Sequence, residues 1–107
     1  MFPTLTSEQI ARVATFGVEA TFEEGQLVFE QGDRDVPFYV VLEGELEIVH
    51  PRGRLEESIT IHHPREFTGE MSLLADRRSL VRGRARGSLR VVRVEQEHLR
   101  LLKRIPI

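Results

Sequence analysis

A chain of 107 residues with 40% apolar and 30% charged residues has the composition of one soluble globular domain, which we expect to span residues 1–107. It contains no cysteine, which excludes disulfide bonds and thiolate metal ligands, and no apolar run approaches the roughly 18 residues of a membrane span. The N-terminus lacks the basic-then-apolar layout of a signal peptide, so the sequence predicts a cytoplasmic protein.

The net charge of −2 hides an uneven distribution of charge along the chain. Residues 1–49 contain ten acidic and two basic residues, whereas residues 50–107 contain seven acidic and thirteen basic ones. Seven arginines lie between Arg77 and Arg93, and arginine suits bidentate recognition of phosphate or carboxylate. For most of these arginines we favour a solvent-exposed strand face that balances the acidic half, and Arg78 is the exception.

The N-terminal segment predicts a short helix. Residues 6–9 read TSEQ, which is a capping box. Ile10, Val13 and Ala14 then place one apolar stripe on a helix of about two to three turns. Gly17 can end this helix.

From Val18 onward, short apolar segments alternate with turn residues, a rhythm typical of an all-β sandwich or barrel. Residues 45–48 read Glu-Leu-Glu-Ile, so one face of this strand is apolar and the other contacts solvent. We expect turns at residues 24–25, 31–33, 43–44 and 51–53. The expected strands are Val18–Phe22, Leu27–Glu30, Phe38–Leu42, Glu45–His50, Ser58–His62, Leu80–Ala85 and Leu89–Val94.

After Val94 the helical period returns, with Leu99, Leu102 and Ile105 on one stripe and Pro106 at its end. The predicted architecture is therefore mainly β, with seven or eight short strands, a short N-terminal helix, one inserted helical turn and a short C-terminal helix. The chain finishes on an apolar Ile-Pro-Ile, from which we expect it to be a fragment of a longer protein, with a native terminus docked on the domain as the alternative.

The stretch from residue 67 to residue 86 holds a glycine, a carboxylate and an arginine cluster close together. Gly69 permits close backbone approach, and the run from Met71 to Ala75 can form one helical turn whose N–H groups point at an anion. Arg78 can neutralise that anion. Glu70 would then accept hydrogen bonds from another part of the same ligand, such as a sugar hydroxyl. A phosphate and a hydroxyl together indicate a nucleotide.

The glycine spacing and this stretch together resemble the cyclic nucleotide-binding domain. This family comprises the β-roll of bacterial cyclic-AMP receptor proteins, of the regulatory subunits of cyclic-nucleotide-dependent kinases and of cyclic-nucleotide-gated channels. The resemblance covers nearly all of the chain. Its structural part is Phe22-x-x-Gly25, Phe29-x-x-Gly32-Asp33 and Phe38-Tyr39-Val40-Val41-Leu42-x-Gly44-x-Leu46. Its functional part is Phe67-Thr68-Gly69-Glu70-Met71-Ser72-Leu73-Leu74 followed by Arg78-Ser79, which matches the phosphate-binding cassette.

The resemblance implies a double-stranded β-helix, a jelly-roll-like β-roll, with a short helix in the phosphate-binding cassette. It implies that Glu70 binds the ribose 2′-hydroxyl. Gly69 and the amides near Met71 and Ser72 would line the pocket.

The same resemblance implies that Arg78 pairs with the cyclic phosphate and that Ser79 adds a hydroxyl and a backbone amide to it. Arg77 is the competing choice for the phosphate ligand. A shift of one residue exchanges the two faces of a strand, so either Leu80 or Val81 lines the pocket.

Two further features carry expectations of their own. The turn at Pro64-Arg65 lacks the glycine that commonly follows this proline in the family, which favours a turn without a positive φ. His62 and His63 are adjacent and point to opposite faces of a strand, the wrong geometry for two ligands of one ion. We therefore expect solvated histidines at a strand end and no metal site.

The sequence does not favour an enzyme or a nucleic-acid-binding protein. With no cysteine, no Gly-x-Ser-x-Gly elbow and no paired-carboxylate motif, no nucleophile with its base can be named. Alternation puts Arg82, Arg84 and Arg86 on one strand face, where a phosphate backbone could lie. However, no aromatic residue is interleaved among them and no recognition helix lies beside them.

We therefore expect a regulatory domain that binds a cyclic mononucleotide, cyclic AMP (cAMP) or cyclic GMP (cGMP), without a cofactor and does no chemistry on it. It would signal to an attached or partner effector domain, and a homodimer is one option. The alternative is a ligand-free β-roll module for dimerisation or for docking a downstream enzyme. The stretches FTGEMSLL and RRSLVRGRA also resemble the version of the domain fused ahead of thioredoxin-reductase-like flavoproteins.

Overall fold

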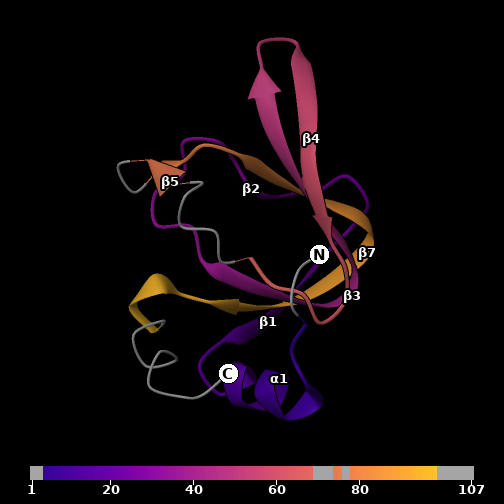
Figure 1. Ribbon diagram of the computed structural model, residues 1–107, viewed down its shortest axis with the longest axis vertical. Coiled ribbons are helices and arrows are strands. Elements are labelled where there is room, and N and C mark those ends of the chain that lie inside the picture. Colours follow the sequence, from indigo (N-terminus) through magenta and orange to yellow (C-terminus); the bar gives the residue numbers. More distant parts are fainter. Residues whose placement is uncertain (1–3, 69–73, 76–77, 99–107) are drawn as a thin grey trace.

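The computed structural model describes residues 4–68, 74–75 and 78–98 (Figure 1). Most of these residues lie in antiparallel strands, which confirms the mainly β prediction. The main sheet has the order β1-β7-β3-β4, β2 also pairs with β7, and β5 and β6 form a separate pair. The strands are β1 (Val18–Phe22), β2 (Leu27–Phe29), β3 (Phe38–Arg52), β4 (Leu55–His62), β5 (Leu74–Ala75), β6 (Arg78–Ser79) and β7 (Arg82–Val94).

Helix α1 (Ser7–Ala14) begins at the predicted capping box. The Gln9 amide donates to the Thr6 hydroxyl (3.1 Å), and the Thr6 amide donates to the Gln9 side chain (2.8 Å). The helix already ends at Thr15, so the prediction that Gly17 ends it is wrong. Gly17 instead lies where the chain passes close to β7, because a Cβ atom there would lie only 2.6 Å from the Arg93 carbonyl oxygen.

Strands β3 and β7 are both longer than predicted. Each was expected as two short strands, but a single strand continues through each expected break. Gly44 was expected in a turn and instead lies in β3 with a φ of 80°, where the pairing with β7 shifts register. A Cβ atom at Gly44 would lie 2.3 Å from the Ser88 carbonyl oxygen, so the close approach of the two strands requires glycine there.

The two faces of the β3–β7 pair bury two separate apolar clusters. Alternation along β3 places Tyr39 and Val41 in the first cluster and Val40 in the second. In the first cluster the rings of Phe29 and Tyr39 stack with centroids 5.9 Å apart. The buried members of the first cluster are Phe29, Tyr39, Val41, Leu46, Ile48, Val81, Ala85, Leu89 and Val91. Those of the second are Leu5, Val13, Val40, Val92 and Val94.

The turn after β4 contradicts the expectation of a turn without a positive φ. Arg65 has a φ of 75°, and the Glu66 amide donates to the His63 carbonyl (3.0 Å), as in a type II turn with Pro64 at its second position. A non-glycine residue with this φ costs roughly 1–2 kcal/mol. Three hydrogen bonds of 2.8 Å offset this cost, since the Arg65 amide, carbonyl and Nε bind Val41 and Leu5.

The helical predictions elsewhere are tested only in part. Leu74 and Ala75 form β5, so the helical turn predicted from Met71 to Ala75 does not include them. Gln96–His98 are helical, and the predicted stripe of Leu99, Leu102 and Ile105 lies outside the described residues. Among the described residues, no helix is long and apolar enough to cross a membrane.

Candidate functional site

The structure describes only some of the predicted ligand-binding residues. Gly69, Glu70, Met71, Ser72 and Arg77 lie outside the described residues, so their roles stay predictions. The backbone that leads to them is anchored, because the Thr68 amide donates to the Tyr39 carbonyl (2.9 Å) and the Tyr39 amide donates to the Thr68 hydroxyl (3.0 Å). The cassette therefore starts from a fixed position on β3.

Arg78 and Ser79 form β6, and the turn at residues 30–33 holds them in place. The Gly32 amide donates to the Ser79 carbonyl and the Ser79 amide donates to the Asp33 carbonyl, each at 2.8 Å. Arg78 Nη1 donates to the Gly32 carbonyl at 3.1 Å. Two backbone bonds and one side-chain bond thus join segments that are 46 residues apart.

This turn is a functional support that the sequence analysis did not assign. Gln31-Gly32-Asp33 was predicted as a turn and as part of the family framework, but not as the support of Arg78. The Glu30 amide donates to the Asp33 carboxylate (2.9 Å) and closes the turn, an arrangement typical of aspartate in turns. The Gln-Gly-Asp sequence was the available signal, but its pairing with β6 is a long-range contact that local sequence does not encode.

Ser79 is buried, with 3% of its surface exposed, and both of its polar groups have partners. The hydroxyl donates to the Val81 carbonyl (2.8 Å) and accepts from the Val81 amide (3.2 Å), and the amide is bound to Asp33. A phosphate would therefore reach the amide or the hydroxyl only by exchanging one of these bonds.

Arg78 is exposed and lies directly opposite Arg34 in an isolated antiparallel bridge. Like charges at such a position repel each other. One guanidinium nitrogen of Arg78 donates to Gly32, and the planar group retains further donors for an anion. Arg34 and Arg78 therefore place two arginines opposite each other at β6.

Leu80 and Val81, the two candidates for the pocket wall, differ in burial. Val81 is 3% exposed and belongs to the first apolar cluster, inside the roll. Leu80 is 42% exposed and faces away from that cluster. Of the two, Val81 is the residue on the inner side.

Four arginines of β7 pair with glutamates. Arg82, Arg84 and Arg90 lie on the outer face, as the solvent-exposed interpretation predicts, whereas Arg93 lies opposite Tyr39. Arg82 binds Glu30 (2.8 Å) and Glu56 (2.6 Å). Hydrogen bonds from Arg82 hold the pKa of the Glu30 carboxyl below its usual value. In the same way Arg84 binds Glu47 and Glu56, Arg90 binds Glu19 and Glu43, and Arg93 binds Glu95. These pairs neutralise the face on which a nucleic-acid backbone would have to lie.

The histidine prediction is correct for one residue and wrong for the other. His63 is exposed and binds Glu45 at 3.0 Å. His62 is not solvated, because it is only 3% exposed and its Nδ1 lies 3.7 Å from the Glu66 carboxylate. Among the described residues, no group of three histidine or acidic side chains is placed to hold a metal ion.

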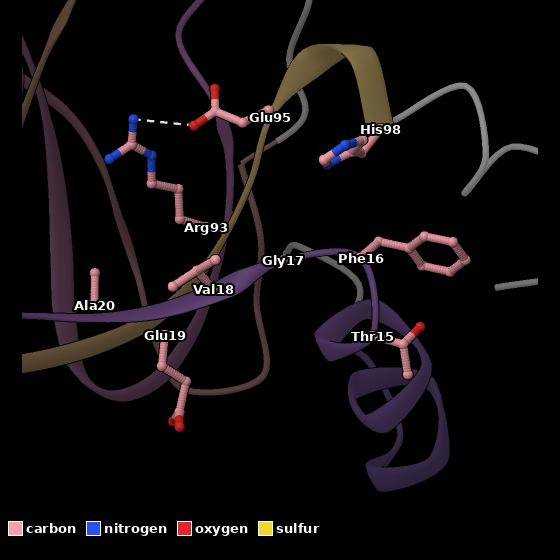
Figure 2. Close-up of a pocket in the computed structure, with 9 residues that line it drawn as sticks. All are labelled: Thr15, Phe16, Gly17, Val18, Glu19, Ala20, Arg93, Glu95 and His98. Atoms are coloured by element: carbon pink, nitrogen blue, oxygen red, sulfur yellow. Dashed lines mark ion pairs between the residues drawn. The ribbon is translucent and has the colours of Figure 1, made fainter.

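A pocket of about 680 Å³ lies away from β6, between the end of α1, the start of β1 and the end of β7 (Figure 2). Arg93 and Glu95 pair at 3.0 Å along one wall, and Phe16 and His98 lie at the other end. A second hollow of about 470 Å³ is lined by the loop at residues 33–37, Tyr39 and Arg93. None of Arg78, Ser79, Leu80 and Val81 lines either space.

Comparison with known protein families identifies the family of this chain. The model of the cyclic nucleotide-binding domain matches residues 19–104. The chain belongs to this family. Membership assigns the domain a regulatory ligand-binding role and agrees with the resemblance seen in the cassette sequence.

Solved structures similar to this cyclic nucleotide-binding domain include three from bacteria. The catabolite activator protein of Thermus thermophilus is 25% identical with a TM-score of 0.78, and the match covers 95% of this chain and 49% of that protein. The N-terminal domain of a transcriptional regulator from Streptomyces coelicolor is 24% identical (TM-score 0.74; 94% and 71% covered). The cyclic-di-GMP-responsive regulator CLP of Xanthomonas campestris is 22% identical (TM-score 0.81; 94% and 49% covered). The chain thus spans about half the length of the first and third of these proteins.

Proposed function

We propose that this domain binds a cyclic mononucleotide, cAMP or cGMP, at residues 67–81 and passes its occupancy to an attached or partner effector domain. The observation that carries the proposal is the family match over residues 19–104, within which Arg78-Ser79 occupies a strand held by the turn at residues 30–33. Arg78 lies opposite a second arginine, Arg34, and arginine side chains form charge-assisted hydrogen bonds with phosphate.

The chemistry assigned to each residue follows from what a cyclic nucleotide offers. The cyclic phosphate carries one negative charge and takes the charge-assisted bonds of Arg78, with Arg77 as the alternative partner. The ribose 2′-hydroxyl donates to the Glu70 carboxylate, and Gly69 and the amides near Met71 and Ser72 line the pocket. Binding would shift the population of effector-competent states by the difference in ligand affinity between those states and the others.

The test is calorimetric titration of the wild-type domain and two arginine variants with cAMP and cGMP. Arg78→Leu removes a charge-assisted bond worth about 1.5–3 kcal/mol, so its Kd should rise about 10- to 150-fold. Arg86→Leu is the matched control, because Arg86 is exposed on the same arginine run and lies opposite Glu45 rather than in the cassette. It should bind like the wild type.

Three outcomes would revise the proposal. Absence of binding by the wild type at millimolar ligand contradicts it. Equal binding by the wild type and Arg78→Leu moves the phosphate contact to Arg77, and Arg77→Leu then takes the place of the variant. Tighter binding of cyclic di-GMP, included because the Xanthomonas relative responds to it, would replace the mononucleotide as the ligand.

A second candidate function is a ligand-free β-roll module that dimerises or docks a downstream enzyme. The observation in its favour is that the Ser79 amide and hydroxyl already have protein partners. A dimer in sedimentation of the ligand-free chain, together with no binding in the titration, would support it. The membership of residues 1–107 in a longer protein, including fusion to a thioredoxin-reductase-like flavoprotein, stays a prediction.

A further inference from the structure

The turn that holds Arg78 is itself held by a glutamate. Glu30 closes the turn with its backbone, which donates to the Asp33 carboxylate and accepts from the Asp33 amide (3.1 Å). Its carboxylate accepts from the Gln31 amide at 2.7 Å. The position of this one side chain therefore affects the geometry of the Gly32 and Asp33 carbonyls, which bind Arg78 and Ser79.

The Glu30 carboxylate is fixed in turn by Arg82. Arg82 Nε donates to both of its oxygens (2.8 and 3.0 Å), and Arg82 Nη1 donates to Glu56 at 2.6 Å. Arg84 also binds Glu56, at 2.9 Å, and binds Glu47 at 3.2 Å. The side chain of Arg82 is only 25% exposed. Several charges in one network keep their geometry better than a single exposed pair does.

The far end of this network lies on the β3–β4 hairpin. Glu56 is the second residue of β4 and pairs with Pro51 of β3 near the hairpin end, which projects from the body of the domain in Figure 1. A continuous set of hydrogen bonds thus runs from the hairpin through Arg82 and Glu30 to the turn and β6.

We propose that Glu56, Arg82 and Glu30 are positioning residues for the Arg78–Ser79 segment, so that the β3–β4 hairpin is tied to the candidate phosphate site. Displacement of the hairpin, for example by a protein bound to it, would loosen the turn and weaken ligand binding. The part of the proposal that concerns affinity rests on the proposed function, and the part that concerns the turn does not.

The chain supplies a matched control at the other end of β7. Arg90 also bridges two glutamates, Glu19 of β1 and Glu43 of β3. Within the described part of the chain, none of these three residues forms a hydrogen bond or ion pair with the turn at residues 30–33. Neutralising Glu43 removes the same kind of interaction without touching the proposed network.

The experiment compares Glu56→Gln and Glu30→Gln with Glu43→Gln. Amide hydrogen exchange in the absence of ligand should be about two- to fivefold faster at Gly32 and Ser79 in the first two variants and unchanged in the third, because an exposed ion pair contributes only weakly to local stability. The Kd for the cyclic nucleotide should rise by a similar factor in the first two variants only. Thermal unfolding of all three should shift only slightly, since Glu30→Gln and Glu43→Gln each lose one surface ion pair and Glu56→Gln loses two.

The readouts separate this proposal from the proposed function. Unchanged exchange at Gly32 and Ser79 in Glu56→Gln overturns the positioning role, whatever the ligand does. Faster exchange with an unchanged Kd overturns the link to ligand affinity. If the wild type binds no cyclic nucleotide, the proposed function fails, and the exchange data alone confirm or overturn the role of the network in fixing the turn.

Discussion

The two faces of β7 (Arg82–Val94) are stabilised by different interactions. The inner face is closely packed: Ala85, Leu89 and Val91 are each at most 1% exposed. The outer face carries Arg82, Arg84 and Arg90, each bound to two glutamates. Close apolar packing therefore selects the side chains of the inner face, whereas ion pairing selects those of the outer face.

The outer face also changes along its own length. Beyond Arg90 it continues with Val92 and Val94, which are buried against Val13 of α1 and Leu5. The same strand face is thus charged where solvent covers it and apolar where the helix covers it. Substitutions inside the roll should therefore destabilise the domain, while those on the charged face should alter geometry and ligand binding at little cost in stability.

The largest effect is expected for Leu89→Ala. Leu89 is 1% exposed in the first apolar cluster, so truncation leaves a cavity and should lower the free energy of unfolding by about 2–5 kcal/mol. Urea denaturation measures this directly. Leu80→Ala is the control, because Leu80 is 42% exposed and should change stability by no more than about 0.5 kcal/mol. Similar losses in the two variants would mean that the inner face is not the stability core.

The next effect concerns Gly83, whose added Cβ would lie 2.4 Å from the Phe29 ring. Gly83→Ala should therefore destabilise the domain by about 1–3 kcal/mol through overpacking. Combining it with Phe29→Leu should recover part of the loss, since the smaller side chain makes room, and a double-mutant cycle by urea denaturation measures the coupling. Strict additivity of the two substitutions would contradict the close contact.

The sequence predicted some of these structural features and missed others. The apolar segments 38–42 and 89–94 predicted strands, and the Glu-Leu-Glu-Ile alternation at residues 45–48 predicted the face that buries Leu46 and Ile48. The capping box predicted the start of α1 within its first turn. What local pattern missed was continuity: Gly44 looked like a turn residue, and only its contact with Ser88 shows that it allows two long strands to pass closely.

The candidate site was predicted from a family pattern and not from local physics. Pairing of Ser79 with Asp33 spans 46 residues, and the burial of Val81 rather than Leu80 follows from that pairing. Arg65 shows the opposite case, in which a residue that disfavours positive φ adopts it because its amide, carbonyl and side chain all gain partners. Such long-range hydrogen bonds override the turn preferences that sequence analysis uses.

The smallest effect tests the charged face through pH. Hydrogen bonds from Arg82 to Glu30, and from Arg84 and Arg82 to Glu56, lower the pKa of both carboxyls from the ordinary value of 4.5. A carboxyl with a lowered pKa stabilises the fold above about pH 4.5, and this stabilisation is lost as the pH falls through the lower folded-state value. The double variant Glu30→Gln, Glu56→Gln should therefore be less stable than the wild type at neutral pH, and the difference should vanish in acid.

Urea denaturation of both proteins between about pH 7 and pH 3 measures this difference. Glu57→Gln is the control, because Glu57 is adjacent to Glu56 but lies 3.7 Å from Arg52 and touches neither Arg82 nor Arg84 among the ion pairs of the described residues. A stability difference that persists unchanged in acid would mean that the arginines hold these side chains by packing rather than by charge. In that case packing would hold the side chains on both faces of β7, and the assignment of ion pairing to the outer face would be wrong.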